Sequence, residues 1–303
     1  MNKKAWSLAG IVAILAVGIG VATVNHQQSA NNNAKKETIV IGSKNFTESK
    51  VLMQIYADAL KKKGYSVKLK ANISSSVIYQ AIKSKQIDLY PEYTGTIATS
   101  YLKKNAAGKS ASAIAKIAKD GMAKENLATL SYAPGSDSQG LAIASSAAKK
   151  YNIYTISDLQ KKANKVRFVS QGEFDKRADA LPGLEKAYGK FNFKSHKVYD
   201  DSLKYRVLEK GDGDVTPAYT TEGQLASSKF TILKDNKHFW PPYNVVPLVR
   251  KSVLKKNPEI ATVLNAVDKK LTTKALSKLN YQVDMQGRSY QKVASEWIAK
   301  NYR

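Results

Sequence analysis

The chain has 303 residues, which is enough for one large or two medium domains with a sizeable core. Its 43% hydrophobic and 9% aromatic content argues against disorder, and the absence of cysteine excludes disulfides, thiolate chemistry and a lipid-modified cysteine. The 49 Lys and Arg residues outnumber 24 Asp and Glu residues and leave a formal charge of +25, which favours anionic partners such as nucleic acid, an envelope polymer or a membrane surface.

The N-terminus has the pattern of an export signal or a membrane anchor. The positive segment MNKKAW precedes an apolar run and then a polar linker of Asn, Gln, Ala and Lys. We expect residues 1–24 to form the signal or anchor and residues 25–37 the linker. Small residues at Gly20 and Ala22 would suit cleavage, so both outcomes stay open. The rest of the chain then works at the outer face of the membrane or is secreted.

Strand and helix patterns alternate after the linker. The order is strand 37–43, helix 46–64, strand 65–73, helix 74–86 and strand 87–93. Thr47 is the expected N-cap of the first helix, and Gly64 is its stop. This order predicts a mostly parallel α/β sheet.

The same alternation returns in the second half of the chain. The order is strand 165–174, helix 202–213, strand 214–221 that breaks at Pro217, strands 231–235 and 244–254, and helices 257–271 and 289–302. Two α/β units of similar layout predict two lobes with facing loops. A ligand then binds at the carboxyl ends of the strands.

No catalytic or metal-binding pattern stands out. The three histidines, His26, His196 and His238, are isolated from one another and show neither ligand spacing nor base-orienter spacing. The GDGD run at 211–214 lacks the later ligands of a calcium loop and is interpreted as a helix-to-strand turn. No phosphate-cradling glycine loop is present. We expect neither an enzyme nor a cofactor.

Tyrosine is unusually frequent, with 17 Tyr against 7 Phe. Tyr93 in EYTGT, Tyr219 in AYTT and Tyr243 in PPYN each stand beside a proline-marked strand end. Each ring alone would suit a strand cap packed on a lobe surface. Three together in loops that face one cleft favour an aromatic box, because the negative faces of tyrosine rings attract a quaternary ammonium.

Six ordered segments carry a resemblance to a known family. They are GSKNFTES (42–49), IDLYPEYTGT (87–96), EFDKR (173–177), PAYTT (217–221), WPPY (240–243) and LNYQVD (279–284). From residue 38 to 300 the chain resembles the substrate-binding proteins of quaternary-amine ABC importers, the glycine betaine/carnitine/choline osmoprotectant family. The resemblance implies an α/β, two-lobe, type II periplasmic-binding-protein-like fold, with a mixed sheet flanked by helices in each lobe and two hinge crossings. Lobe 1 would comprise residues 38–136 plus 242–303, and lobe 2 residues 137–241.

The resemblance also implies an aromatic cage formed by Tyr93, Tyr219 and Tyr243. Gln139 stands where the family has a fourth cage tyrosine, so the box is three-sided or is completed by Trp240 or Tyr90. Tyr90 is expected to pack inside its lobe instead. Gly95 is expected to permit the turn after Tyr93.

The other matched positions are polar. Lys44 and Arg177 are the cations that similar proteins aim at a ligand carboxylate, Thr96 offers that group a hydroxyl, and Asp137 is an acidic partner near the cage. Two cations favour a zwitterion such as glycine betaine, carnitine or ergothioneine over choline.

Together these features predict an extracytoplasmic, monomeric receptor. It would capture a quaternary amine by hinge closure and deliver it to a membrane permease, with no nucleic acid bound and with ATP hydrolysis on a separate subunit. The alternative is a secreted basic protein that binds nucleic acid or envelope polyanions and uses its tyrosines as stacking platforms.

Overall fold

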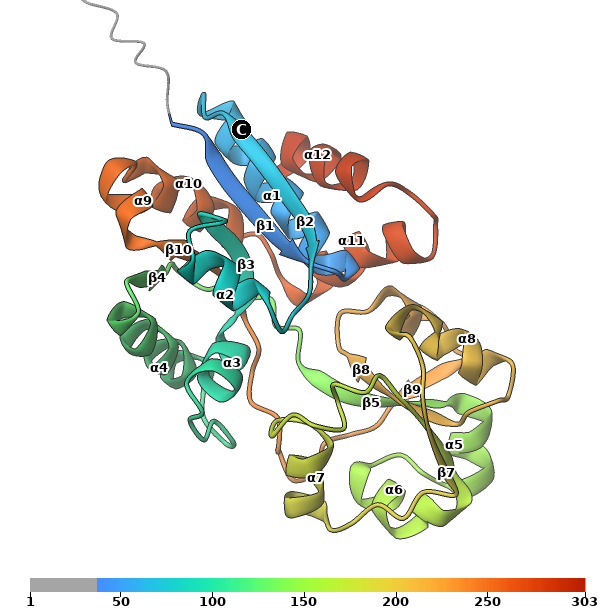
Figure 1. Cartoon of the computed structure of the whole chain (residues 1–303). Coiled ribbons are helices and arrows are strands. Elements are labelled where there is room, and N and C mark those ends of the chain that lie inside the picture. Colours follow the sequence, from blue (N-terminus) through green and yellow to red (C-terminus); the bar gives the residue numbers. More distant parts are fainter. Residues whose placement is uncertain (1–36, 303) are drawn as a thin grey trace, which may run out of the picture. The chain divides into compact units, whose positions relative to one another are not determined.

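Two five-stranded sheets form the framework of the chain (Figure 1). The computed structural model describes residues 37–302, so the expected signal or anchor segment and nearly all of the linker lie outside the described residues. Within residues 37–302, no helix is both long and apolar enough to span a membrane.

The first sheet has the strand order β2-β1-β3-β10-β4. β1 is parallel to β2 and β3, whereas β10 is antiparallel to β3 and β4. Its strands are β1 (Ile39–Lys44), β2 (Val67–Ile73), β3 (Leu89–Tyr93), β4 (Leu127–Thr129) and β10 (Val245–Arg250). The chain therefore returns to the first sheet after it has completed the second.

The second sheet has the order β7-β6-β8-β5-β9 and repeats this layout. β6 is parallel to β7 and β8, and β5 is antiparallel to β8 and β9. Its strands are β5 (Gln139–Ala144), β6 (Arg167–Ser170), β7 (Ser195–Val198), β8 (Val215–Tyr219) and β9 (Phe230–Ile232). In each sheet, one strand runs antiparallel to the other four: β10 in the first sheet and β5 in the second.

Helices flank both sheets. Around the first sheet they are α1 (Thr47–Lys62), α2 (Ile78–Lys83), α3 (Thr94–Thr96), α4 (Ala111–Lys124), α9 (Lys251–Lys256), α10 (Glu259–Asp268), α11 (Thr273–Asp284) and α12 (Tyr290–Asn301). Around the second they are α5 (Ser145–Tyr151), α6 (Ile156–Lys162), α7 (Leu181–Tyr188) and α8 (Lys204–Glu209). α1 packs against β1, α10 and α12, as Figure 1 shows. Its apolar face, including Leu52 and Ile55, is fully buried, at about 1.5–3 kcal/mol per large side chain.

Three local expectations are wrong. Phe46, not Thr47, holds the N-cap position of α1, because the Thr47 hydroxyl donates instead to Asp284 Oδ1 at 2.5 Å. β8 continues through Pro217: this residue lies opposite Leu141 of β5, and β8 meets β6 at Val215, so no β6 partner is lost at the proline. The strand expected over 244–254 ends at Arg250, where α9 begins.

Candidate functional site

Pairing between β3 and β10 brings Tyr93 close to Tyr243. Tyr93 ends β3 and lies opposite Val245, and the Thr94 N–H donates to the Asn244 carbonyl at 2.9 Å. The Asn244 N–H in turn donates to Thr94 Oγ1 at 3.2 Å. The rings of Tyr93 and Tyr243 are buried at 5% and 2% exposure, so neither tyrosine is a surface cap.

Gly95 is required by the close approach of the Tyr243 ring, not by a turn after Tyr93. It lies inside the short helix α3, and a Cβ at this position would lie 2.6 Å from a carbon of the Tyr243 ring. Real Cβ atoms do not approach a ring that closely. Glycine here gives space to Tyr243, whereas the expectation was that it permits a turn.

The second sheet brings Tyr219 to the same place. Tyr219 ends β8 directly opposite Gln139, the first residue of β5, so the two side chains share one face of the sheet. The Gln139 Nε2 group donates to Tyr243 Oη at 2.9 Å. Burial raises the pKa of Tyr219 to about 12, which keeps this ring neutral at pH 7. Strand register and one hydrogen bond therefore connect all three predicted cage positions.

Asp179 is the centre of the polar contacts. Its Oδ2 atom accepts hydrogen bonds from Tyr243 Oη and Gln139 Nε2, each at 3.0 Å, and from Thr99 Oγ1 at 3.3 Å. Arg177 binds both carboxylate oxygens, through Nε at 2.8 Å and Nη2 at 2.5 Å. Burial alone would raise the pKa of Asp179, but the Arg177 hydrogen bond and charge lower it. The carboxyl group is therefore an ionised acceptor.

Arg177 keeps donors to spare. Among the hydrogen bonds of residues 37–302 its Nη1 group has no partner, and its side chain is 29% exposed. Burial would lower the pKa of Arg177, but Asp179 raises it, so the guanidinium stays charged. It can bind a ligand carboxylate without releasing Asp179.

Lys44 is not a free cation. It ends β1 at 4% exposure, and its Nζ atom lies 2.5 Å from Glu92 Oε1 and 5.3 Å from the centroid of the Tyr93 ring. A ligand carboxylate would have to share this ammonium with Glu92. Thr96 is half-buried in α3, close in sequence to Tyr93.

Asp137 lies in a second buried network. It accepts from the Thr221 hydroxyl at 2.6 Å, and Thr221 in turn accepts through its carbonyl from Asn280 Nδ2 at 2.9 Å. Asn280 also donates to Glu48 Oε2 at 2.8 Å, and Glu48 Oε1 accepts from Tyr93 Oη at 2.7 Å. Burial, followed by the charge of Glu48, raises the pKa of Asp137 well above its usual range. The acidic partner expected near the cage is thus linked to Tyr93 through Thr221, Asn280 and the Glu48 carboxyl group.

Comparison with known proteins decides the family. Residues 37–300 match the family described as the substrate binding domain of the ABC-type glycine betaine transport system. The chain belongs to this family.

Relatives and solved structures agree with that assignment. A glycine-betaine-binding protein of Pseudomonas aeruginosa is 29% identical over 89% of each chain. An ergothioneine transport permease/ergothioneine binding protein of Helicobacter pylori is 30% identical over 89% of this chain and 48% of the relative. A crystal structure of a glycine betaine/carnitine/choline ABC transporter protein is 26% identical, covers 86% of this chain and 98% of its own, and has a TM-score of 0.71. The expected two-lobe fold class is confirmed.

Membership of this family has two direct consequences. Its proteins are substrate-binding components of transporters, which is not an enzyme class, and they work outside the cytoplasm. Within residues 37–302 no three His, Asp or Glu side chains gather as a metal site. His196 instead contacts Asp175 at 3.1 Å.

The two aromatic candidates to complete the cage differ. Tyr90 is fully buried in an apolar cluster and donates to Glu92 Oε2 at 3.2 Å, in agreement with the expectation that it packs inside its lobe. Trp240 is 9% exposed, and its Nε1 group donates to the Asp179 carbonyl at 2.8 Å. Trp240 therefore borders the polar centre, whereas Tyr90 does not face it.

Sequence reasoning missed three buried charges beside the tyrosines. Asp179 follows Arg177 by two residues, a spacing that suggests a partner only once Arg177 is singled out. Glu48 lies in the GSKNFTES segment, and nothing in that motif predicts its contact with Tyr93. Lys204 has a buried ammonium 5.4 Å from the centroid of the Tyr219 ring and pairs with Glu222. It resembles any other lysine in a lysine-rich sequence.

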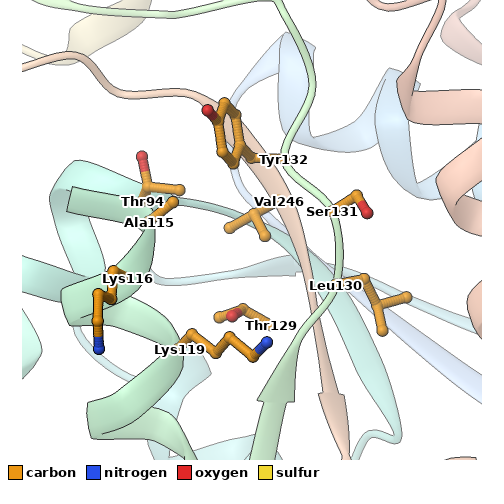
Figure 2. A pocket seen from close by; sticks show the side chains of 9 residues that line it. All are labelled: Thr94, Ala115, Lys116, Lys119, Thr129, Leu130, Ser131, Tyr132 and Val246. Carbon is orange, nitrogen blue, oxygen red and sulfur yellow. The ribbon is translucent and has the colours of Figure 1, made fainter. Parts of the chain in front are cut away.

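A separate pocket lies on the first sheet and contains none of the eight predicted ligand residues. It has a volume of about 470 Å³ between α4 and the segment that follows β4. Figure 2 shows Lys116 and Lys119 on α4 across from Tyr132 and Leu130. Thr94, next to Tyr93, is at its rim.

Proposed function

We propose that this protein captures a quaternary ammonium compound outside the cytoplasm and delivers it to an ABC permease. The observation that carries the proposal is that Tyr93 at the end of β3, Tyr219 at the end of β8 and Tyr243 just before β10 are connected through strand register and Gln139. Tyrosine faces attract a cation that has no hydrogen to donate, and burial makes this attraction stronger. Membership of the family supports the same ligand class.

Each side chain has a proposed role. Tyr93, Tyr219 and Tyr243 enclose the ammonium, and Arg177 binds the ligand carboxylate through its unused donors. Lys44 and Thr96 assist at the carboxylate, while Asp137 and Gln139 line the polar side. ATP hydrolysis belongs to another subunit.

We propose lobe 1 as residues 38–136 plus 242–303 and lobe 2 as residues 137–241. The two crossings run side by side, since Ser136 bridges Asn244 and the Asp137 N–H donates to the Tyr243 carbonyl at 3.0 Å. Hydrogen bonds from Thr99 to Asp179 and from Asn280 to Thr221 join residues of the two proposed lobes. The open form that admits the ligand would lack these two contacts, and hinge closure on the ligand would form them again.

We further propose that residues 1–24 direct export and, unless they are cleaved off, anchor the protein at the outer face of the cell membrane. The receptor would act as a monomer and bind no nucleic acid. A single small ligand between two lobes of one chain requires no second copy.

Calorimetric titration tests the ligand class. The compounds are glycine betaine, carnitine, choline, proline betaine and ergothioneine, and at least one should bind with measurable heat. Absence of binding by all five would refute the proposal. Tight, salt-sensitive binding of a polyanion in the same experiment would support the alternative of a polyanion-binding protein.

A further inference from the structure

Gln139 carries an unpaired acceptor inside the site. Its side chain is 5% exposed, and its Nε2 group donates to Asp179 and to Tyr243. Its Oε1 atom is buried and has no hydrogen-bond partner among residues 37–302. A buried acceptor without a partner costs about 1–3 kcal/mol, so an occupant that satisfies it is favoured.

The amide has one orientation. Asp179 Oδ2 receives donors from Arg177, Tyr243 and Gln139, and an ionised carboxylate can only accept. The nitrogen of Gln139 must therefore face Asp179, and its oxygen points away from that carboxylate. Gln139 lies opposite Tyr219 in the β5–β8 pair, which places the amide among the predicted cage rings.

Glycine betaine has nothing to offer this oxygen. A quaternary ammonium has no N–H, and a carboxylate at neutral pH only accepts. Arg177 can still receive the carboxylate through Nη1. A third group on the ligand, with its own hydrogen, is therefore needed to pair Gln139.

We propose that Gln139 Oε1 accepts a hydrogen bond from a hydroxyl or ring N–H of the ligand. The site then selects zwitterionic quaternary amines that carry such a donor over glycine betaine. This inference rests on the proposed function, because it refines the ligand of that same site.

Matched ligands test the proposal on the unsubstituted protein. Carnitine and γ-butyrobetaine differ only by one hydroxyl, and ergothioneine offers a ring N–H. Calorimetry should give a preference of about tenfold or more for a donor-bearing ligand over its partner without the donor, or over glycine betaine. If glycine betaine binds at least as tightly as carnitine and ergothioneine, the proposal is overturned while the proposed function stands.

The Gln139→Met variant identifies the acceptor. Methionine keeps the length of the side chain but removes Oε1, so the preference for the donor-bearing ligand should fall to about twofold or less. Tyr243→Phe is the control, since it removes a partner of Nε2 but leaves Oε1 and should weaken all zwitterions alike. A preference that survives in Gln139→Met would contradict the assignment. If the unsubstituted protein binds none of these quaternary amines, that result would instead contradict the proposed function.

Discussion

Gly95 controls how closely the Tyr243 ring approaches the end of β3. In Gly95→Ala the new methyl group would lie 2.6 Å from that ring, so the ring must shift. We expect the free energy of unfolding to decrease by about 1–3 kcal/mol, as in other overpacked sites, and ligand binding to become weaker. Gly140→Ala is the control, because its nearest atom is 3.9 Å away. Urea unfolding and calorimetry measure both effects, and equal stability of the two variants would contradict the close approach.

Arg177 should matter more for ligands that carry a carboxylate. Arg177→Ala removes the free Nη1 donors and leaves Asp179 without its guanidinium partner. We expect glycine betaine or carnitine binding to weaken by about 1.5–3 kcal/mol and choline binding by clearly less. Arg167→Ala is the matched control, since Arg167, the first residue of β6, forms a similar two-point pair with Asp214. Equal losses for both ligand types would remove Arg177 from the carboxylate site.

At the scale of residues, the sequence predicted candidate ligand-binding residues but not the side chains with which they pair. Tyr93, Tyr219 and Tyr243 were predicted because their local motifs mark strand ends. The pairing of Lys44 with Glu92 was not predicted, because it depends on how β1 and β3 are brought together. Gln139 was noted as a missing aromatic, but its hydrogen bond to Tyr243 arises between residues 104 positions apart.

At the scale of elements, a buried acid joins α1 to α10. Asp268 is fully buried, and both of its oxygens accept from Tyr56 Oη, at 3.0 and 3.2 Å. Burial raises the pKa of Asp268 well above its usual value, so the native state holds a proton that the unfolded chain releases. The stabilising contribution is therefore complete below the unfolded pKa of about 3.9 and is lost as pH rises toward the native pKa.

The neutral isostere tests this sign. Asp268→Asn removes the cost of ionisation but keeps an oxygen for Tyr56, so the free energy of unfolding should increase at pH 7–8 by about 1 kcal/mol or more and change little near pH 4. Urea unfolding across this pH range is the measurement. Asp284→Asn is the comparison: burial also raises the pKa of this partly buried group, which accepts from Thr47, so its stability should change with pH in the same direction but less than for Asp268→Asn. A destabilised Asp268→Asn variant at pH 8 would show that the buried group is needed as a carboxylate.

Element types were easier to predict than their pairing. Periodicity was enough to predict the existence of α1, α10 and α12, because apolar residues recur along each at helical spacing, although it did not give the N-cap of α1. The antiparallel insertion of β10 between β3 and β4 was not predictable in this way, since its partners lie more than 100 residues earlier in the chain. The expected break of β8 at Pro217 is wrong because proline usually ends a strand for want of an N–H, whereas β6 pairs with β8 at Val215 and not at Pro217.

At the scale of the whole molecule, the formal charge of +25 and the ligand site are separate features. The two cations beside the predicted cage are paired with carboxylates, as the buried Lys44 is with Glu92 and the partly buried Arg177 with Asp179. The excess positive charge therefore belongs mainly to exposed lysines. Exposed charge is screened by salt, and buried pairs are screened much less.

Salt should then separate the two kinds of binding. The Debye length falls from about 30 Å at 0.01 M salt to about 8 Å at 0.15 M, so retention on a soluble polyanion such as heparin should weaken steeply over this range. The affinity for a quaternary amine should change by about twofold or less, because Lys44 is buried, Arg177 is partly buried, and each is already paired with a carboxylate. Heparin chromatography and calorimetry at matched salt concentrations measure the two responses. If heparin displaces the quaternary amine, or if both affinities fall together with salt, the two ligands compete for the same site. That result would favour the alternative function, a protein that binds polyanions, over capture of a quaternary amine.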